Sequence, residues 1–388
     1  MQEKNGVYEV ARRTRAMYNQ RPNSTSGRLR MARKEQGRKK NQSQSNQATA
    51  VTLKAVSKYV GLTPGTISAA MNNSLACRSV ADRTKRRIFA AAREMEYKPN
   101  DLARPLRVKR SYTIGVIAAE LGDPYGQFII AGIERHLRAN GFLYLTAVHR
   151  HDNELLESYS QLLLERGVEG FITIDTPIVR EPALPTVAIA GHRPFAAVTN
   201  IALDHKAAAF SALRHLLEYG HREFAFLKGP AISSDTESRW QSIVEASHEL
   251  GIRIHPDRVV ELNATQACAA RAPEYAYPFA KELLSRNRKF TALFAFNDNS
   301  AIAAMSALQD AGLRVPENVS VIGFDDIPLA SYSNPTLTTV RQPLQKMGEI
   351  AARTLLDRIE NRAEYVAEIA IETELIVRRS TGPTPKAI

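Results

Sequence analysis

Residues 51–73 read VTLKAVSKYVGLTPGTISAAMNN, and two short helical patterns meet in this stretch at Gly61. A tight turn between helices needs a residue that tolerates positive φ, which glycine does without steric cost. Apolar residues recur at the spacing that fills a small core between two crossed helices: Val56, Val60, Leu62, Ile67 and Met71. The stretch therefore predicts a helix-turn-helix.

A third, amphipathic helix is predicted over Thr84–Met95, with Ile88, Ala92 and Met95 on one face and basic residues elsewhere. Residues 97–110, YKPNDLARPLRVKR, then lead directly into a β-type run from Tyr112. A helix-turn-helix alone also occurs as a helical pair in an ordinary bundle. Followed by a basic helix, a short hinge and an α/β domain, it is typical of a ligand-controlled transcription factor.

This order of segments resembles the lactose-repressor (LacI/GalR) family, whose hinge pattern is present here as Tyr97, Pro99, Asn100, Ala103 and Leu106. The resemblance covers roughly Ala50 to Arg379. It implies a homodimeric, effector-responsive regulator, more specifically a repressor, bound to a near-palindromic double-stranded operator. The effector would be a sugar, a sugar acid or a nucleobase-like molecule.

The charge distribution supports a DNA-binding N-terminal part. Residues 1–110 carry 25 Lys and Arg against 7 Asp and Glu, whereas the remaining 278 residues carry 27 against 33. A basic segment of this kind neutralises phosphates and releases counterions, which makes DNA affinity sensitive to salt.

Length and composition set the outer bounds. A chain of 388 residues with 44% apolar residues is expected to form about two or three domains with a sizeable core. Two cysteines, Cys77 and Cys268, make no disulfide framework, which favours a reducing compartment. No apolar run approaches the ~18 residues of a membrane span, and no secretory signal is recognisable. We expect a bacterial cytoplasmic, nucleoid-associated protein that does not contact membranes.

Residues 1–50 are rich in Arg, Lys, Gln, Asn and Ser and contain few large apolar residues, which predicts a disordered basic extension. The extension is either a DNA-binding tail or the product of an early start, with Met31 as the true first residue. The sequence leaves both alternatives open.

From Tyr112 onward, short apolar runs alternate with helical patterns, as in βαβ units of a parallel sheet. The resemblance implies the two-lobed periplasmic-binding-protein type I fold, which is Rossmann-like, with effector bound between the lobes. The predicted organisation is an extension (1–50), a helix-turn-helix headpiece (51–99), a hinge (100–110), an effector-binding and dimerisation domain (111–380) and a tail (381–388). The predicted lobes are 111–202 with 343–368, and 203–342 with 369–380.

Ligands of parallel sheets bind at the carboxyl ends of the strands. By resemblance, the effector-binding residues are Asp123, Tyr125, Arg239, Phe294, Asn297 and Asp325. Arg239 and Asp325 are expected to face each other across the pocket floor, and Phe294 is expected to stack on an effector ring. Asp298 is expected to cap the helix that follows it, and Trp240 to lie in the core.

The predicted DNA-binding residues are Thr52, Leu53, Thr63, Pro64, Gly65, Thr66, Ser68, Ala69, Asn72, Tyr97, Asn100, Ala103 and Leu106. In the family, hydrogen-bonding side chains are common at the positions of Pro64, Gly65 and Ala69, and none of these three residues can supply one. Few side-chain hydrogen bonds to base edges are therefore expected. Leu106 should wedge into the minor groove, while Pro105 delays or weakens the hinge helix.

Enzymatic signatures are weak. Gly-x-Ser-x-Gly and phosphate-loop patterns are absent from the sequence. His149 and His151 lack further ligands at metal-binding spacing and are expected on the surface. The expectation is a regulator with no enzymatic activity, no cofactor and no metal. The alternative is a solute-binding protein of the same two-lobed fold, which a mobility-shift assay would distinguish.

Deleting residues 1–50 is expected to flatten the dependence of log affinity on log salt, because the segment carries a net charge of +9. The measurement is operator binding by fluorescence anisotropy at several salt concentrations, on the full chain and the truncated one. Equal slopes would mean that the segment does not contact DNA.

Overall fold

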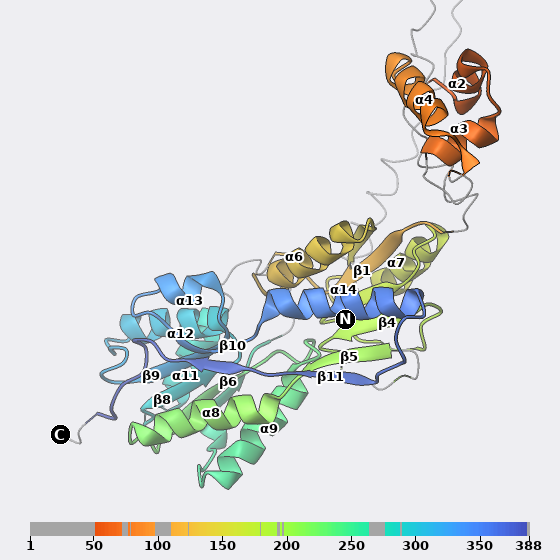
Figure 1. Cartoon of the computed structure of the whole chain (residues 1–388). Helices are drawn as coiled ribbons and strands as arrows, with labels where there is room; N and C mark the ends of the chain where they lie inside the picture. The colour runs from red at the N-terminus through yellow and green to blue at the C-terminus, as the bar shows by residue number, and fades with distance from the viewer. Residues whose placement is uncertain are drawn as a thin grey trace, which may run out of the picture. The chain divides into compact units, whose positions relative to one another are not determined.

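The computed structural model describes residues 51–71, 77, 79–97, 110–122, 124–178, 180–191, 195, 198–263, 276–287 and 289–385. It divides between Pro99 and Asn100 into two compact units, each considered by itself below (Figure 1). The predicted extension 1–50 and all of the predicted hinge except Arg110 lie outside the described residues. None of the helices described is long and apolar enough to cross a membrane.

The smaller unit contains the predicted helix-turn-helix: α2 (Leu53–Val60), α3 (Pro64–Met71) and α4 (Asp82–Glu94). Gly61 ends α2 with a φ of 73°, as predicted, and its N–H donates to the Ser57 carbonyl at 3.0 Å. Three side chains with no exposed surface, Val56, Ile67 and Ile88, form the centre of the three-helix core. The core is small because each helix contributes only one or two large apolar residues.

The larger unit is built on two six-stranded sheets, as predicted for the two-lobed fold. The first has the order β11-β5-β4-β3-β1-β2 and the second the order β12-β10-β9-β8-β6-β7. All neighbouring strands are parallel except β10 and β12. The strands of the first sheet are β1 (Thr113–Ala118), β2 (Leu143–Val148), β3 (Phe171–Ile174), β4 (Thr186–Ile189), β5 (Val198–Leu203) and β11 (Glu368–Ile371). Those of the second are β6 (Phe224–Lys228), β7 (Val259–Glu261), β8 (Ala292–Ala295), β9 (Ser320–Asp325), β10 (Thr338–Arg341) and β12 (Glu374–Ile376).

Helices cover both faces of each sheet, which is why inner strands such as β1 and β4 are continuous apolar runs rather than alternating ones. In the first lobe α6 (Pro124–Ala139) and α14 (Leu344–Ile359) pack on one face, and α7 (Asn153–Glu165) packs on the other. In the second lobe α8 (His205–Glu218) and α9 (Thr236–Glu249) cover one face. The other face carries α11 (Tyr277–Arg286) and α12 (Asp298–Asp310), with the short α13 (Pro328–Tyr332) beside α12 (Figure 1).

Helices α6 and α14 approach each other through a pair of glycines. A Cβ on Gly132 would lie 1.9 Å from the carbonyl oxygen of Gln345, and one on Gly348 would lie 2.0 Å from that of Ile129. The clashing atoms are backbone atoms of the opposite helix, which cannot turn away as a side chain can. Only glycine therefore permits this spacing, which joins the first helix of the lobe to the helix formed after the chain returns from the second lobe.

Two predicted boundaries are wrong. β11 pairs residue by residue with β5, from Glu368 opposite Asn200 to Ile371 opposite Leu203, so 203 and 369–371 belong to the first lobe. The predicted tail makes contacts as far as Thr384: Thr381 is 6% exposed, and the N–H of Thr384 donates to the Tyr219 carbonyl at 2.8 Å. The chain crosses between the lobes three times, after β5, β10 and β11, as the resemblance implied.

Replacement by alanine should accelerate amide exchange at one glycine of the helix-turn-helix and not at another. Gly61→Ala places a Cβ at φ 73°, which costs about 1 kcal/mol, so amide exchange in α2 and α3 should accelerate about fivefold. Gly65→Ala is the matched control, because its Cβ would meet nothing closer than the Thr63 hydroxyl at 3.8 Å. Hydrogen exchange of the full chain, read by mass spectrometry, checks both variants. Equal acceleration in the two would contradict the role assigned to the left-handed turn.

Candidate functional site

The carboxyl ends of the strands carry an unusual concentration of strained backbone. Nine described non-glycine residues have positive φ, and six of them end or follow strands of the two sheets: Arg150, His151, Asp175, Ala190, Asp325 and Asp326. Such conformations cost free energy and persist where surrounding contacts hold them, often at functional sites. The strain therefore marks the edge at which the sequence predicted an effector.

A carboxyl group of the first lobe is bonded to the second lobe at this edge. Asp175, which follows β3, accepts from the Ser234 N–H at 2.8 Å, from the Ser234 hydroxyl at 2.6 Å and from the Ser233 hydroxyl at 3.3 Å. The Ser234 hydroxyl also contacts the carbonyl oxygen of Ala190. Burial raises the pKa of the Asp175 carboxyl and the charge of Asp235 raises it further, whereas the bonds from Ser234 lower it. The loop before α9 is thus attached to the first lobe.

Arg239 is bonded to protein atoms rather than unengaged, whereas the expectation that it faces Asp325 stays a prediction. Its guanidinium donates to Asp235 at 3.0 Å and to the Phe296 carbonyl at 2.7 Å, and only 4% of the residue is exposed. The rings of Phe296 and Phe324 lie 4.6 and 3.9 Å from its central carbon. Because Asp235 is one helical turn before Arg239, the pair fixes the start of α9 against the ends of β8 and β9.

Asp325 is hydrogen-bonded to a residue that follows β10. It is 7% exposed at the end of β9, and the amide of Gln342 donates to its Oδ1 at 2.6 Å. Gln342 is 3% exposed, and its Oε1 has no hydrogen-bond partner among the residues that the structure describes. Gln342 was not among the predicted residues, because β10, the strand that positions it, contains a single apolar residue.

Tyr125 joins the two halves of the site. It lies in the first turn of α6 in the first lobe. Burial holds the pKa of its hydroxyl well above the ordinary value, and the charges of Asp235, Asp175 and Asp325 raise it further, while Arg239 lowers it. The charges of carboxyls from both lobes therefore act on this hydroxyl. Asp123, predicted beside it, lies outside the described residues.

Two further predicted contacts are placed differently by the structure. Phe294 is 2% exposed in the core beneath α8 and α9, so its ring is not available for stacking, whereas Phe296 lies at the strand end. Asn297, not Asp298, caps α12: its side chain accepts from the Ser300 N–H at 2.9 Å in a capping box. Asp298 is fully buried, and this burial raises its carboxyl pKa to about 7.

His149 is not on the surface as predicted. It is 1% exposed, its Nε2 lies 3.0 Å from the Thr176 hydroxyl, and its Nδ1 accepts from the His151 N–H at 3.2 Å. Burial lowers its pKa to about 4, so the ring is neutral near pH 7. No group of three or more potential metal ligands occurs in the part of the chain that the structure describes.

The structure describes only some of the predicted DNA-binding residues. Thr63, Pro64 and Gly65 are exposed at the start of α3, and the Thr63 hydroxyl accepts from the Thr66 N–H at 3.2 Å. Ala69 is 8% exposed, so its methyl group is not on that exposed surface. Thr52 caps α2, and both Leu53 and Tyr97 pack against the headpiece core. Thr66 and Ser68 are half-buried, while Asn72, Asn100, Ala103 and Leu106 lie outside the described residues.

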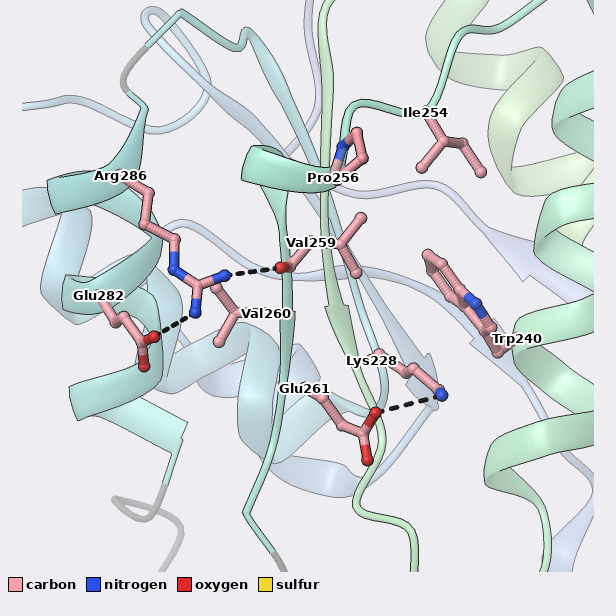
Figure 2. Close-up of a pocket in the computed structure, with 9 residues that line it drawn as sticks. All are labelled: Lys228, Trp240, Ile254, Pro256, Val259, Val260, Glu261, Glu282 and Arg286. Atoms are coloured by element: carbon pink, nitrogen blue, oxygen red, sulfur yellow. Dashed lines mark hydrogen bonds and ion pairs between the residues drawn. The ribbon is translucent and has the colours of Figure 1, made fainter.

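A pocket lies within the second lobe, between α9, β7 and α11 (Figure 2). Trp240, which was expected in the core, is half-buried in its wall. The charged groups of the walls are paired with each other: Lys228 with Glu261 at 3.2 Å, and Arg286 with Glu282 and with the Val259 carbonyl at 3.1 Å. All the lining residues belong to one lobe, so a ligand there would not contact the other.

Comparison with known proteins gives consistent results. Residues 52–100 match the model of bacterial regulatory proteins of the lacI family, and residues 213–381 match the periplasmic binding protein-like domain. The HTH-type transcriptional repressor PurR of Haemophilus influenzae is 30% identical over 340 residues, 85% of this chain and 98% of its own. Repressor CytR of Escherichia coli is 30% identical over 346 residues, 87% of this chain and 98% of its own.

Solved structures agree on the fold. The Lac repressor dimer bound to operator and an anti-inducer has a TM-score of 0.77 at 24% identity, covering 86% of this chain and 99% of that one. The complex of the transcriptional regulator CelR with cellobiose has a TM-score of 0.64 at 27% identity, covering 85% and 99%.

Ser234→Ala should weaken the contact between the lobes, because it removes the hydroxyl that bridges Asp175 and Ala190. The expected loss is about 1–3 kcal/mol of unfolding free energy, measured by urea denaturation. Ser233→Ala is the control and should lose less than half as much, since its bond to Asp175 is 3.3 Å long. Equal losses would show that the Ser234 hydroxyl does not hold the lobes together.

Proposed function

Because this chain belongs to the lacI family of bacterial regulatory proteins, we propose that a small molecule bound between its lobes controls the affinity of its headpiece for DNA. The protein is an effector-responsive, DNA-binding transcriptional repressor. The cleft, the headpiece and the hinge each contribute a distinct part of that activity.

The observation that carries the assignment is the set of contacts from Asp175 to Ser233 and Ser234. These contacts join the carboxyl edge of one sheet to that of the other, so a ligand at this edge must either keep or replace them. Its binding free energy then depends on the angle between the lobes. A ligand that differs in affinity between two lobe arrangements shifts the DNA-binding equilibrium, with a coupling of about 1–3 kcal/mol.

The effector is bound by Tyr125 and Asp175 from the first lobe and by Asp325 and Gln342 from the second. Asn297 adds its side-chain amide nitrogen, since its oxygen is used in the cap of α12. Arg239 acts as a positioning residue, because its guanidinium donates to protein atoms, the Asp235 carboxyl and the Phe296 carbonyl. Phe296 replaces Phe294 as the aromatic surface available to a ligand ring.

The operator is read by the exposed start of α3, at Thr63, Pro64 and Gly65, set in the major groove. Leu106 inserts into the minor groove and supplies affinity that the side chains of α3 cannot. Specificity then depends on thymine methyl contacts and on the ease of bending the site as much as on hydrogen bonds to bases.

The active form is a homodimer joined through the outer face of the first lobe. β2 is the edge strand of its sheet, and Leu143 and Leu145 on it are 74% and 40% exposed. Phe128 on the exposed face of α6 adds a further apolar side chain, 36% exposed. A second copy of this chain is the occupant that we assign to these residues, since a near-palindromic operator requires a twofold-symmetric reader.

The protein has no catalytic role in this proposal and acts in the bacterial cytoplasm, at the nucleoid, where operator DNA is found. A solute-binding protein with the same two lobes would have no use for residues 51–71 and 79–97, which form a basic helix-turn-helix. A mobility-shift assay separates these alternatives, because only the repressor retards DNA.

The hinge provides the test. With an operator selected from random-sequence DNA by the wild-type protein, Leu106→Ala should weaken binding severely, by about tenfold or more. Pro105→Ser should tighten it, because serine restores the backbone N–H donor that proline lacks. Fluorescence anisotropy measures both dissociation constants. An unchanged constant for Leu106→Ala would overturn the assignment of the wedge.

A further inference from the structure

The carboxyl group of Glu169 binds the residues that lead from the predicted hinge into the first lobe. Its Oε2 accepts from Nε and from a terminal nitrogen of Arg110 at 2.9 and 2.8 Å, and its Oε1 accepts from the Tyr112 N–H at 2.7 Å. The Ser111 hydroxyl lies 3.5 Å from the same Oε1. Hydrogen bonds between charged groups are stronger than neutral ones, so this one side chain holds three consecutive residues firmly.

The backbone at Tyr112 is strained and is held by further contacts. Its φ is 52°, a conformation that a bulky residue rarely adopts and that neighbouring groups must maintain. The Tyr112 ring meets the edge of Phe142 at 5.3 Å, and the guanidinium of Arg110 lies 4.9 Å from its centre. A second carboxyl, that of Glu360 after α14, lies 3.9 Å from Arg110. The point at which the chain enters β1 is therefore fixed from several sides.

Strand β3 connects Glu169 to the effector cleft. Glu169 lies two residues before β3, and Asp175, which is bonded to the second lobe, follows it directly. At a rise of about 3.3 Å per residue the two carboxyls are about 20 Å apart, at opposite edges of the sheet. β3 is buried along its whole length and pairs with β1 from Gly115 opposite Phe171 onward. Two buried, hydrogen-bonded strands move together, so a shift at one end reaches the other.

The junction between Glu169 and β3 is tightly packed. A Cβ on Gly170 would lie 2.9 Å from the Pro185 carbonyl oxygen and 2.9 Å from a methyl group of Leu355 on α14. The backbone beside Glu169 is thus in contact with its neighbours and has no room to absorb a displacement of the strand.

From this continuity we propose that Glu169 is the residue through which the lobes position the hinge. The proposal rests on the proposed function, in which a ligand between the lobes controls DNA affinity, and it names the route. A change of lobe angle acts on Asp175, β3 carries the shift across the sheet, and Glu169 passes it to Arg110 and Tyr112. Glu169 is a positioning residue, since its carboxyl binds protein atoms.

The route can be tested through operator binding, without a known effector. Ser234→Glu places a second carboxylate against Asp175 and forces the lobes apart, in place of a ligand. With the operator selected by the wild-type chain, this substitution should change the dissociation constant by about fivefold or more. Combined with Glu169→Gln, which removes the charge that binds Arg110, it should change the constant by less than about twofold. Fluorescence anisotropy measures all four constants of this cycle.

The control is Glu349→Gln, which breaks another ion pair of the first lobe, with Arg135 at 2.7 Å, away from the hinge. In that background Ser234→Glu should keep its full effect. The Tm of every variant is recorded in parallel. A merely structural role of Glu169 would lower the Tm and the operator affinity but leave the effect of Ser234→Glu unchanged.

The results distinguish this proposal from the proposed function. An equal effect of Ser234→Glu with and without Glu169→Gln would overturn the proposal and leave the proposed function standing. No effect of Ser234→Glu in the wild-type background would contradict the proposed function itself. If Glu169→Gln does not fold, Arg110→Gln breaks the same pair from its more exposed side, and if Ser234→Glu does not fold, Ser234→Ala replaces it. The same two results then decide.

Discussion

The buried ion pair between Asp235 and Arg239 organises the candidate site. Removing Asp235 would leave the buried guanidinium of Arg239 without its carboxylate, a far larger penalty than the net stability that the pair contributes. The pair holds the first turn of α9 against the Phe296 carbonyl and between two aromatic rings. Ser233 and Ser234, just before this turn, are thereby placed opposite Asp175. The contact between the lobes thus depends on an interaction made entirely inside one of them.

The rigidity of the two lobes is achieved differently. The first relies on direct backbone contact between α6 and α14, which Gly132 and Gly348 allow. The second relies on hydrogen bonds between side chains. The carboxyl of Asp326 accepts from both Arg341 and Arg378. The ring of the buried His221 is hydrogen-bonded to Thr291, Ser320 and the Gly382 carbonyl. Two lobes that are each rigid can differ in relative angle while each keeps its own packing. That property is what a switch operated from the cleft requires.

Local signals in the sequence were sufficient for the headpiece and for most of the fold. Gly61 required a left-handed turn, and uniformly apolar strands such as β1 and β4 stand out from their neighbours. β10 and β11 were missed because β10 contains a single apolar residue and β11 is only four residues long, and only pairing with another strand makes them strands. The same limit applied to the site. Arg239 and Asp325 were identified, but their partners, Asp235 and Gln342, depend on contacts in three dimensions.

The connectivity of the sheets has a consequence for biosynthesis. β5 receives its outer neighbour, β11, only after the intervening second lobe has been made, and α14 covers β3 and β4 equally late. The second lobe in turn buries Ser380 and Thr381, close to the C-terminus. On the ribosome, the first lobe therefore cannot be completed before Ile371 emerges, nor the second before Thr381, and an apolar sheet edge stays uncovered until then. Nascent chains of this protein should need protection by chaperones for most of their synthesis, and a premature stop codon that removes Ser380 and Thr381 should give an unstable product.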